Sequence, residues 1–381
     1  MTWSDPAPLT HFDVNASLMS LGILIVLGVY GMSKINLKGL SQTVLGSVSP
    51  DELGPTLTHE HLLIDFECMF NEPKEASLKG LAYQTIALDN LGWIRQNYFS
   101  NLDNLTLLDE TTASEEASLF MRAGGGTIVD ATTIGIGRDP LALARIARKT
   151  GLNIIMGAGY YVDAVHPQSI EDLNETDIAR QIIDEISIGV ADTEIKAGII
   201  GEIGCTWPLT ENEKKILRAS AQAQQETGAA ILIHPGRDED APREIVEILA
   251  EAGADITRTI IGHLDRTISN INLLKELAQS GCYMEWDLFG SENSFYPLSN
   301  FDMPSDAQRI DIIKEIIADG YAKKIVIAQD ICTKHRLVKY GGHGYGHVLE
   351  NIVPRMKIKG ISEDDINSII VKNPADILTF V

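Results

Sequence analysis

The chain has 381 residues, and its 53 acidic side chains outnumber its 31 basic ones, which gives a formal net charge of −22 at neutral pH. A chain this acidic is repelled by nucleic acid and by anionic membrane surfaces, so neither is expected as its main partner. Cys68, Cys205, Cys282 and Cys332 are widely spaced and include no Cys-x-x-Cys pair. This spacing argues against a disulfide framework and a thiolate zinc site, and it favours a reducing, cytoplasmic location.

Residues 16–32 form an uncharged, mostly apolar run of about 17 residues, near the lower limit for crossing a bilayer. No lysine or arginine precedes the run, whereas a secretory signal begins with one. If the run is a membrane anchor, the lysines that follow it place the C-terminal part in the cytosol. The alternatives are a helix docked on the domain and a translated upstream extension before Met32, and we favour the extension. We therefore treat residues 1–41 as an N-terminal extension and residues 42–381 as one domain.

From about residue 45 onward, short β-rich runs alternate with amphipathic helical stretches, without a proline-rich linker. The strand candidates in chain order are 56–66, 126–133, 153–161, 197–205, 230–234, 259–263, 282–287 and 324–330. The helical stretches between them include 139–148, 170–188, 211–226, 242–252, 270–280 and 305–320. Several of these stretches end at a glycine, a common helix stop. This alternation predicts an α/β fold, a (β/α)8 TIM barrel, with a doubly wound open sheet as the alternative.

Potential metal ligands lie on five of the strand candidates. In a TIM barrel the chemistry lies at the carboxyl ends of the strands, where these residues would meet. Residues two apart in a strand face the same way, so His59 and His61 are suited to share one ion. Four imidazoles and two carboxylates predict two divalent ions such as Zn²⁺. The candidate ligands are His59, His61, Glu202, His234, His263 and Asp330.

The motifs around these residues resemble the amidohydrolase superfamily, specifically its phosphotriesterase branch and the animal phosphotriesterase-related proteins. The resemblance runs from about residue 42 to the C-terminus. It rests on Gly-Pro-Thr-Leu-Thr-His-Glu-His at 54–61, Ala-Gly-Ile-Ile-Gly-Glu-Ile-Gly-Cys-Thr-Trp-Pro-Leu-Thr at 197–210, Ile-His-Pro-Gly-Arg at 233–237, His-Leu-Asp-Arg-Thr at 263–267, Asp-Leu-Phe-Gly at 287–290 and Lys-Tyr-Gly-Gly-His-Gly-Tyr at 339–345.

The resemblance implies how the ligands divide between two ions. It implies that one ion is more buried and the other more exposed, and that one carboxylate joins them. By this resemblance the more buried ion is held by His59, His61 and Asp330, the more exposed ion by His234 and His263, and the joining residue is Glu202.

Two positions depart from the bacterial phosphotriesterases. Those proteins bridge their metals with a carbamylated lysine directly after the Ala-Gly-Ile-Ile stretch, where this chain has Gly201, and its acid, Glu202, comes one residue later. Because a one-residue shift turns a side chain to the other face of a strand, we expect a local bulge there. The bacterial proteins also have a relay histidine after the aspartate of the seventh strand, where this chain has Leu288. The proton relay must therefore differ, which weakens organophosphate hydrolysis as the native activity.

The resemblance implies amide hydrolysis, because animal phosphotriesterase-related proteins are linked to cleavage of N-acetyltaurine into acetate and taurine. Asp330 is then expected to accept a proton from the attacking water and to return it to the departing amine. Lactonase, esterase and phosphotriesterase activities are alternatives. A barrel that binds metal without turnover is another, and oligomer formation is left open.

An amide substrate of this kind carries a permanent anion, so cationic residues near the barrel mouth are candidates for binding it. Arginine is suited to planar and tetrahedral oxyanions. The candidates for binding a small anionic N-acyl substrate are Arg237, Arg266, Lys334, Arg336 and Tyr160. Further aromatic residues that could wall the pocket are Tyr161, Trp207 and Tyr345.

Overall fold

The computed structural model describes residues 37–292, 296, 298–299 and 302–381. The apolar run 16–32, predicted as an extension or anchor, lies outside these residues. Within the described ranges, no helix combines the length and the apolar content that a membrane crossing requires. The first described strand, β1 (Ser41–Thr43), begins at the last residue that we assigned to the extension.

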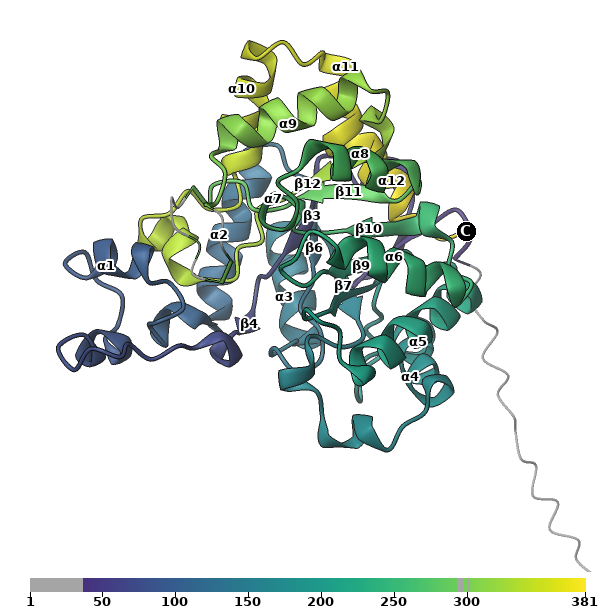
Figure 1. Ribbon diagram of the computed structural model, residues 1–381, viewed down its shortest axis with the longest axis horizontal. Coiled ribbons are helices and arrows are strands. Elements are labelled where there is room, and N and C mark those ends of the chain that lie inside the picture. The colour runs from purple at the N-terminus through teal and green to yellow at the C-terminus, as the bar shows by residue number, and fades with distance from the viewer. Residues whose placement is uncertain (1–36, 293–295, 297, 300–301) are drawn as a thin grey trace, which may run out of the picture. The chain divides into compact units, whose positions relative to one another are not determined.

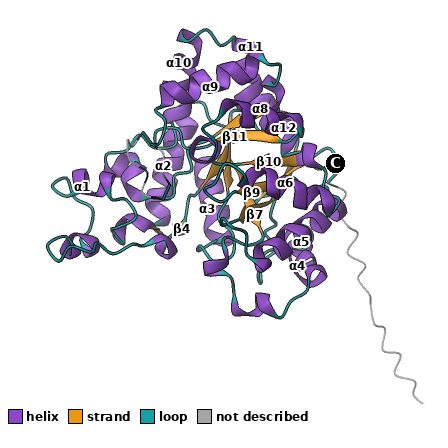
Figure 2. Cartoon of the chain, in the orientation of Figure 1, coloured by secondary structure: helices purple, strands orange, loops and turns teal. Residues whose placement is uncertain are grey.

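Eight parallel strands form the central sheet, and helices surround it (Figures 1 and 2). Neighbouring strands follow one another in chain order, and the backbone N–H of Asp330 donates to the carbonyl oxygen of His59 at 3.1 Å, beside the first strand. The predicted TIM barrel is thereby confirmed. The strands are β3 (Thr56–Glu60), β6 (Thr127–Asp130), β7 (Asn153–Ala158), β8 (Ile199–Gly204), β9 (Ile231–His234), β10 (Thr259–Ile261), β11 (Tyr283–Trp286) and β12 (Ile325–Ile327).

The helices begin and end largely where capping residues predict. Helix α5 begins at a capping box made by Thr210 and Glu213 and ends at Gly228, which has a φ of 75°. The helices are α1 (Leu91–Gln96), α2 (Glu110–Arg122), α3 (Pro140–Thr150), α4 (Glu175–Ser187), α5 (Glu211–Thr227), α6 (Ala241–Glu251), α7 (Leu264–Thr267), α8 (Ile271–Gln279), α9 (Asp306–Ala318), α10 (Val353–Ile358), α11 (Glu363–Asn367) and α12 (Asn373–Ile377).

Short helical turns connect these elements. Two π turns, η11 (Val348–Ile352) and η12 (Ser368–Lys372), precede α10 and α12. The 3-10 turns are η1 (Pro50–Glu52), η2 (Glu67–Met69), η3 (Lys79–Tyr83), η4 (Asp103–Leu105), η5 (Asp163–Val165), η6 (Gln168–Glu171), η7 (Ile256–Arg258), η8 (Ala322–Lys324), η9 (Lys334–Arg336) and η10 (Val338–Tyr340).

Several predicted strands are shorter in the structure, and two elements differ from the sequence prediction in a way that the contacts explain. The expected helix 170–188 begins only at Glu175, because the side chain of Asn174 accepts the N–H of Asp177 and caps the helix there. The expected strand 56–66 leaves the barrel after Glu60. Its continuation, β4 (Ile64–Asp65), pairs antiparallel with β5 (Thr106–Leu107), which closes an insertion of roughly forty residues that contains α1.

An apolar cluster fills the barrel interior below its carboxyl end, as expected for a closed barrel. Seven strands each contribute a fully buried residue to it: Val129, Ile155, Ile199, Leu232, Ile260, Tyr283 and Val326. Leu53, Ile377 and Leu378 pack against the same cluster. The site therefore rests on a rigid, close-packed floor.

A hairpin formed by β1 and β2 (Gly46–Val48) covers the amino ends of β7 and β8. The amide of Gln42 donates to the carbonyl oxygens of Ile186 at 2.9 Å and Ala197 at 2.6 Å. The backbone N–H of Val44 donates to the carbonyl of Ile154 at 2.9 Å. The amino end of these strands is thus closed by backbone and amide groups.

Candidate metal centre

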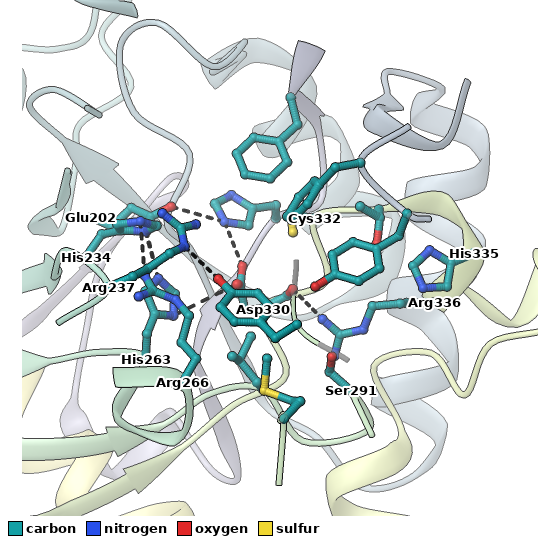
Figure 3. Close-up of a pocket in the computed structure, with 18 of the residues that line it drawn as sticks. Glu202, His234, Arg237, His263, Arg266, Ser291, Asp330, Cys332, His335 and Arg336 are labelled. Carbon is teal, nitrogen blue, oxygen red and sulfur yellow. Dashed lines mark hydrogen bonds and ion pairs between the residues drawn. The ribbon is translucent and has the colours of Figure 1, made fainter. Parts of the chain in front are cut away.

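All six predicted ligands converge at the carboxyl end of the barrel, and the Glu202 carboxylate lies among the four histidines. Figure 3 shows Glu202, His234, His263 and Asp330 of this set. Its oxygens lie close to one nitrogen of each of the four histidines. The distances are 3.2 Å to His59 Nε2, 3.3 Å to His61 Nε2, 2.9 Å to His234 Nδ1 and 3.5 Å to His263 Nε2. On the other side of His61, its Nε2 lies 3.2 Å from Asp330 Oδ1.

A bulge in β8 lets Glu202 reach this position. The register of β8 against β9 shifts between Ile200 and Ile203, so the expected bulge is present. Gly201 has a φ of +122°, and a Cβ added there would lie 2.1 Å from the carbonyl oxygen of Leu232. Only glycine fits such a position. The lysine that bacterial phosphotriesterases carry at this point therefore has no room, and the acid comes from the next residue.

Two of the ligand residues have left-handed backbones. His263 has a φ of 54° and Asp330 a φ of 47°, and Ala191 is the third non-glycine residue with positive φ in the described chain. This conformation is disfavoured for residues with a Cβ and persists where the surroundings impose it. Both residues follow their strands, β10 and β12, at the turn where the chain leaves the barrel. These turns point the side chains back over the barrel mouth.

Two carboxylates below the histidines were not assigned a role by the sequence analysis. Asp287 accepts from the backbone N–H of His263 at 2.7 Å and lies 2.8 Å from His263 Nδ1. Glu285 lies 3.1 Å from His59 Nδ1, and Asp287 lies 3.3 Å from the same nitrogen. Carboxylates behind metal-binding imidazoles orient the rings and make them better ligands. The sequence could have indicated these two residues, because Glu285 lies in β11 and Asp287 directly follows that strand, so that the two residues are two apart and face the same way.

The Nδ1 side of His61 contacts a neutral hydroxyl group, in contrast to the carboxylates behind His59 and His263. Its Nδ1 lies 2.9 Å from the hydroxyl oxygen of Thr132, and the hydroxyl of Tyr345 donates to its carbonyl oxygen at 2.7 Å. The intervening Glu60 accepts from the backbone N–H groups of Gln329 at 2.7 Å and Ile331 at 2.9 Å. These contacts tie the first strand to the loop that carries Asp330.

Buried acidic groups make this end of the barrel suited to cations. Burial raises the pKa of Glu60 to about 8 and that of Asp265 to about 7, and it also raises the pKa of Glu285 and Asp130. Each rise reports that the carboxylate lacks enough positive charge to offset its lost hydration. A divalent ion supplies such charge and inverts the local preference.

The donor set passes a test of fit for two divalent ions. His59 Nε2 is buried and, although a Glu202 oxygen lies 3.2 Å away, it makes no well-aligned hydrogen bond to a described residue, as expected for a nitrogen that binds a metal. Three groups each have ligand atoms within 4.8 Å of one another, and all three include His59. They are His59 with Glu202 and His263, His59 with His61 and Asp330, and His59 with Glu285 and Asp287. Nitrogen and oxygen donors without a thiolate suit zinc and similar ions.

A cavity opens over the cluster at the barrel mouth, and the ligands His61, Glu202, His234, His263 and Asp330 form part of its wall. One part of its wall is cationic and another is aromatic or apolar. Besides the ligands, its lining includes Phe66, Tyr98, Phe99, Tyr161, Arg237, Arg266, Leu288, Tyr296, Met303, Cys332, His335 and Arg336.

Three of the five predicted substrate-binding residues line the cavity, and two do not. Arg237, Arg266 and Arg336 lie in its wall. Lys334 instead points away, and its ammonium lies 2.6 Å from Asp103. Tyr160 is turned outward and its hydroxyl bonds to Gln181 (the neighbouring Tyr161 faces the cavity). The structure therefore places Lys334 and Tyr160 outside the described lining of the cavity.

The aromatic wall differs from the predicted one. Trp207 is 37% exposed and does not line the cavity, and Tyr345 lies behind His61. The described aromatic lining comes from Tyr161 and from residues that were not predicted: Phe66, Tyr98, Phe99 and Tyr296. Phe66, Tyr98 and Phe99 belong to the insertion after β3, and the sequence does not indicate that this insertion folds over the site.

Leu288 lines the cavity where bacterial phosphotriesterases have the relay histidine. Its backbone N–H donates to both oxygens of Asp265, at 3.2 and 3.1 Å, and Arg309 Nε lies 3.6 Å from Asp265 Oδ1. Asp265 is thus held by a backbone amide and a guanidinium, and the side chain of Leu288 has no group that transfers a proton.

Comparison with known proteins agrees with this geometry. A model of the Phosphotriesterase family matches residues 39–378. A phosphotriesterase-related protein of Nematostella vectensis is 50% identical, over 90% of this chain and 99% of that protein. The N-acetyltaurine hydrolase of Dictyostelium discoideum is 48% identical, over 90% of this chain and 98% of that protein. The crystal structure of a resiniferatoxin-binding protein from Rhodobacter sphaeroides superposes with a TM-score of 0.87 at 35% identity, covering 89% of this chain and 95% of that one.

Proposed function

The chain belongs to the phosphotriesterase family of metal-dependent hydrolases, and from that premise we propose that it cleaves the amide bond of N-acetyltaurine, releasing acetate and taurine. The observation that carries the proposal is the nearly full-length similarity to an N-acetyltaurine hydrolase. A cavity that joins a metal-ligand cluster to three arginines supports it. The amide group of such a substrate suits the metal-ligand cluster, and its anionic group suits the arginines.

Two divalent ions, which we expect to be zinc, would occupy the cluster. His59, His61 and Asp330 would hold one ion and His234 and His263 the other, with Glu202 between them. Ions of this kind lower the pKa of water and polarise carbonyl oxygens.

Asp330 is the carboxylate that we assign to proton transfer. Its side chain is 13% exposed, whereas those of Glu202, Glu285 and Asp287 are at most 2% exposed. Arg336 donates to the carbonyl oxygen of Asp330 at 2.7 Å and fixes the turn that carries it. In our proposal Asp330 accepts a proton from the attacking water and gives it to the departing amine nitrogen.

Arg266 positions the imidazole of His234. Its Nη2 lies 3.1 Å from His234 Nε2 and donates to the carbonyl oxygen of Pro235 at 3.0 Å. Its side chain is buried, so water does not compete for these contacts. The ring is thereby held with Nδ1 facing Glu202.

The deciding experiment measures taurine release from N-acetyltaurine by purified protein loaded with zinc. N-acyl amino acids, lactones and phosphotriesters are assayed beside it. Efficient release of taurine supports the proposal, whereas cleavage of lactones or phosphotriesters without release of taurine would replace it with one of the alternative activities. No turnover of any substrate by fully loaded protein would favour a barrel that only binds metal.

We propose a cytoplasmic location, because Cys68, Cys205, Cys282 and Cys332 are all free. A membrane anchor in residues 16–32 is the alternative. Fractionation of a protein that starts at Met1 beside one that starts at Met32 separates the two. If only the longer form sediments with membranes, the run is an anchor.

A further inference from the structure

Three arginines line the cavity, and the hydrogen bonds that each already makes decide which of them is available to a substrate. Figure 3 shows Arg237 and Arg266 near His234, and Arg336 on the side of His335. A guanidinium has five N–H donors, so an arginine that is committed to the protein has few left for a ligand.

Arg266 and Arg336 are committed to the protein. Arg266 is 3% exposed and bonds to His234, Pro235 and, at 3.2 Å, the hydroxyl of Thr267. Arg336 donates through Nη1 to the carbonyl oxygen of Asp330 and through Nη2, at 3.0 Å, to that of Phe289. Both guanidinium groups therefore hold the site together.

Arg237 is held differently. Its Nε donates to the hydroxyl oxygen of Tyr296 at 2.6 Å, and its guanidinium carbon lies 6.0 Å from the centre of that ring. Its two Nη groups make no hydrogen bond to the described residues, and no described carboxylate pairs with it. The side chain is thus anchored at Nε, and the described part of the chain leaves both terminal nitrogens uncommitted.

The backbone before Arg237 also fixes where it points. Gly236 packs on the loop after β8, and a Cβ added there would lie 2.6 Å from the backbone of Thr206 and 2.7 Å from Trp207 Cβ. This contact leaves no room for a side chain at position 236, so the loop after β9 packs closely on the loop after β8. The guanidinium is therefore held in the same cavity wall as the ligand cluster, three residues beyond His234.

We propose that Arg237 is the residue that selects an anionic substrate, binding a sulfonate or carboxylate through its two Nη groups while the acyl group faces the cluster of Glu202 and Asp330. This inference rests on the proposed amide hydrolysis and names its determinant of specificity. Two parallel N–H···O bonds to one anionic group are the geometry for which a guanidinium is suited. A partly buried cation that has no carboxylate partner among the described residues is suited to pair with such an anion.

The test compares an anionic with a neutral amide. Arg237→Gln is expected to raise KM for N-acetyltaurine roughly 10- to 100-fold, the usual size of a charge-assisted contact, with little change in kcat. The rate on N-propylacetamide, which has no sulfonate, should change less than about threefold. Arg243→Gln is the matched control, because Arg243 is exposed on α6 and pairs with Asp240 and Glu247. An equal loss on both amides would overturn the proposal in favour of a structural role.

A binding measurement keeps the proposal testable if the wild type hydrolyses neither amide. Calorimetry with ethanesulfonate on zinc-loaded protein should show binding to the wild type and to Arg243→Gln, and a Kd at least tenfold weaker for Arg237→Gln. Binding that is lost only in Arg237→Gln would uphold the anion site while the proposed hydrolysis fails. Equal binding by all three proteins, or none by the wild type, would overturn the site itself.

Discussion

Replacing Gly201 by alanine tests whether β8 must bend to deliver Glu202. The added Cβ would lie 2.1 Å from the carbonyl oxygen of Leu232 and 2.9 Å from the N atom of Ile203, at a φ of +122°. A positive φ costs a residue with a Cβ about 1–2 kcal/mol. Overpacking a close contact adds about 1–3 kcal/mol. We therefore expect Gly201→Ala to lower the free energy of unfolding by about 2–5 kcal/mol, summed from these two terms.

Gly151→Ala is the matched control for backbone strain. Gly151 ends α3 with a φ of +77°, and nothing lies within 4 Å of a Cβ added there. It should therefore cost only the backbone term, about 1 kcal/mol. The difference between the two variants measures the steric contact with Leu232 separately from the strain.

Urea unfolding gives the stabilities, and metal content and taurine release report the site. Relief of the contact has to move the backbone beside Glu202 by about 1 Å, a misplacement that typically costs about 100-fold in rate. The reasoning is refuted if Gly201→Ala is as stable as Gly151→Ala and keeps full metal content and turnover. A stable but inactive variant would show that the backbone of β8 moves beside Glu202 and that the packing of the core is kept.

Three further predictions concern Asp330, Asp287 and His335. Asp330→Asn should lower kcat for taurine release about 10²- to 10⁴-fold, as loss of a general acid–base group does; undiminished kcat at full metal content would exclude Asp330 from proton transfer. Asp287→Asn weakens the support of His263 Nδ1 and should lower metal affinity about 10- to 100-fold in competition with a chelator; unchanged affinity would contradict that support. Burial and the nearby Arg336 lower the pKa of His335 to about 3, below its value of about 6.5 in the unfolded chain. Its neutral imidazole therefore stabilises the fold fully above pH 6.5, and that contribution is lost as the pH falls toward 3, by about 2 kcal/mol at pH 5. His335→Gln should reduce the wild-type loss of unfolding free energy between pH 7 and pH 5 by that amount in urea titrations, and identical pH dependence in both proteins would show that burial leaves this histidine unaffected.

The barrel and the place of its ligands could be predicted from sequence because both follow from local patterns. Each apolar run is long enough for one strand, and a glycine or a capping residue marks the ends of most helices. The alternation of strands and helices can therefore be recognised in the sequence. The rule that chemistry gathers at the carboxyl ends of barrel strands then placed His59, Glu202 and Asp330 together. The bulge beside Gly201 was also predictable, because Glu202 comes one residue after the position at which bacterial phosphotriesterases carry their bridging lysine.

The cavity wall could not be predicted, because it depends on which way a turn sends each side chain. Tyr160 and Tyr161 are neighbours on an extended segment and face opposite ways, so composition alone does not choose between them. Lys334 and Arg336 lie two apart in the 3-10 turn η9, where Lys334 turns to the partly buried Asp103 and Arg336 reaches the site. Long-range partners settle such choices, and sequence order does not reveal them.

The apolar cluster that fills the barrel limits where substrate can enter and where products can leave. Val129, Ile155 and their counterparts on five other strands occupy the interior below the site, so the described residues leave no passage along the barrel axis. Substrate must enter, and both products must leave, on the side of the ligand cluster. A product that keeps the anionic group would meet Arg237 on its way out, and it would compete with the next substrate for the same entrance.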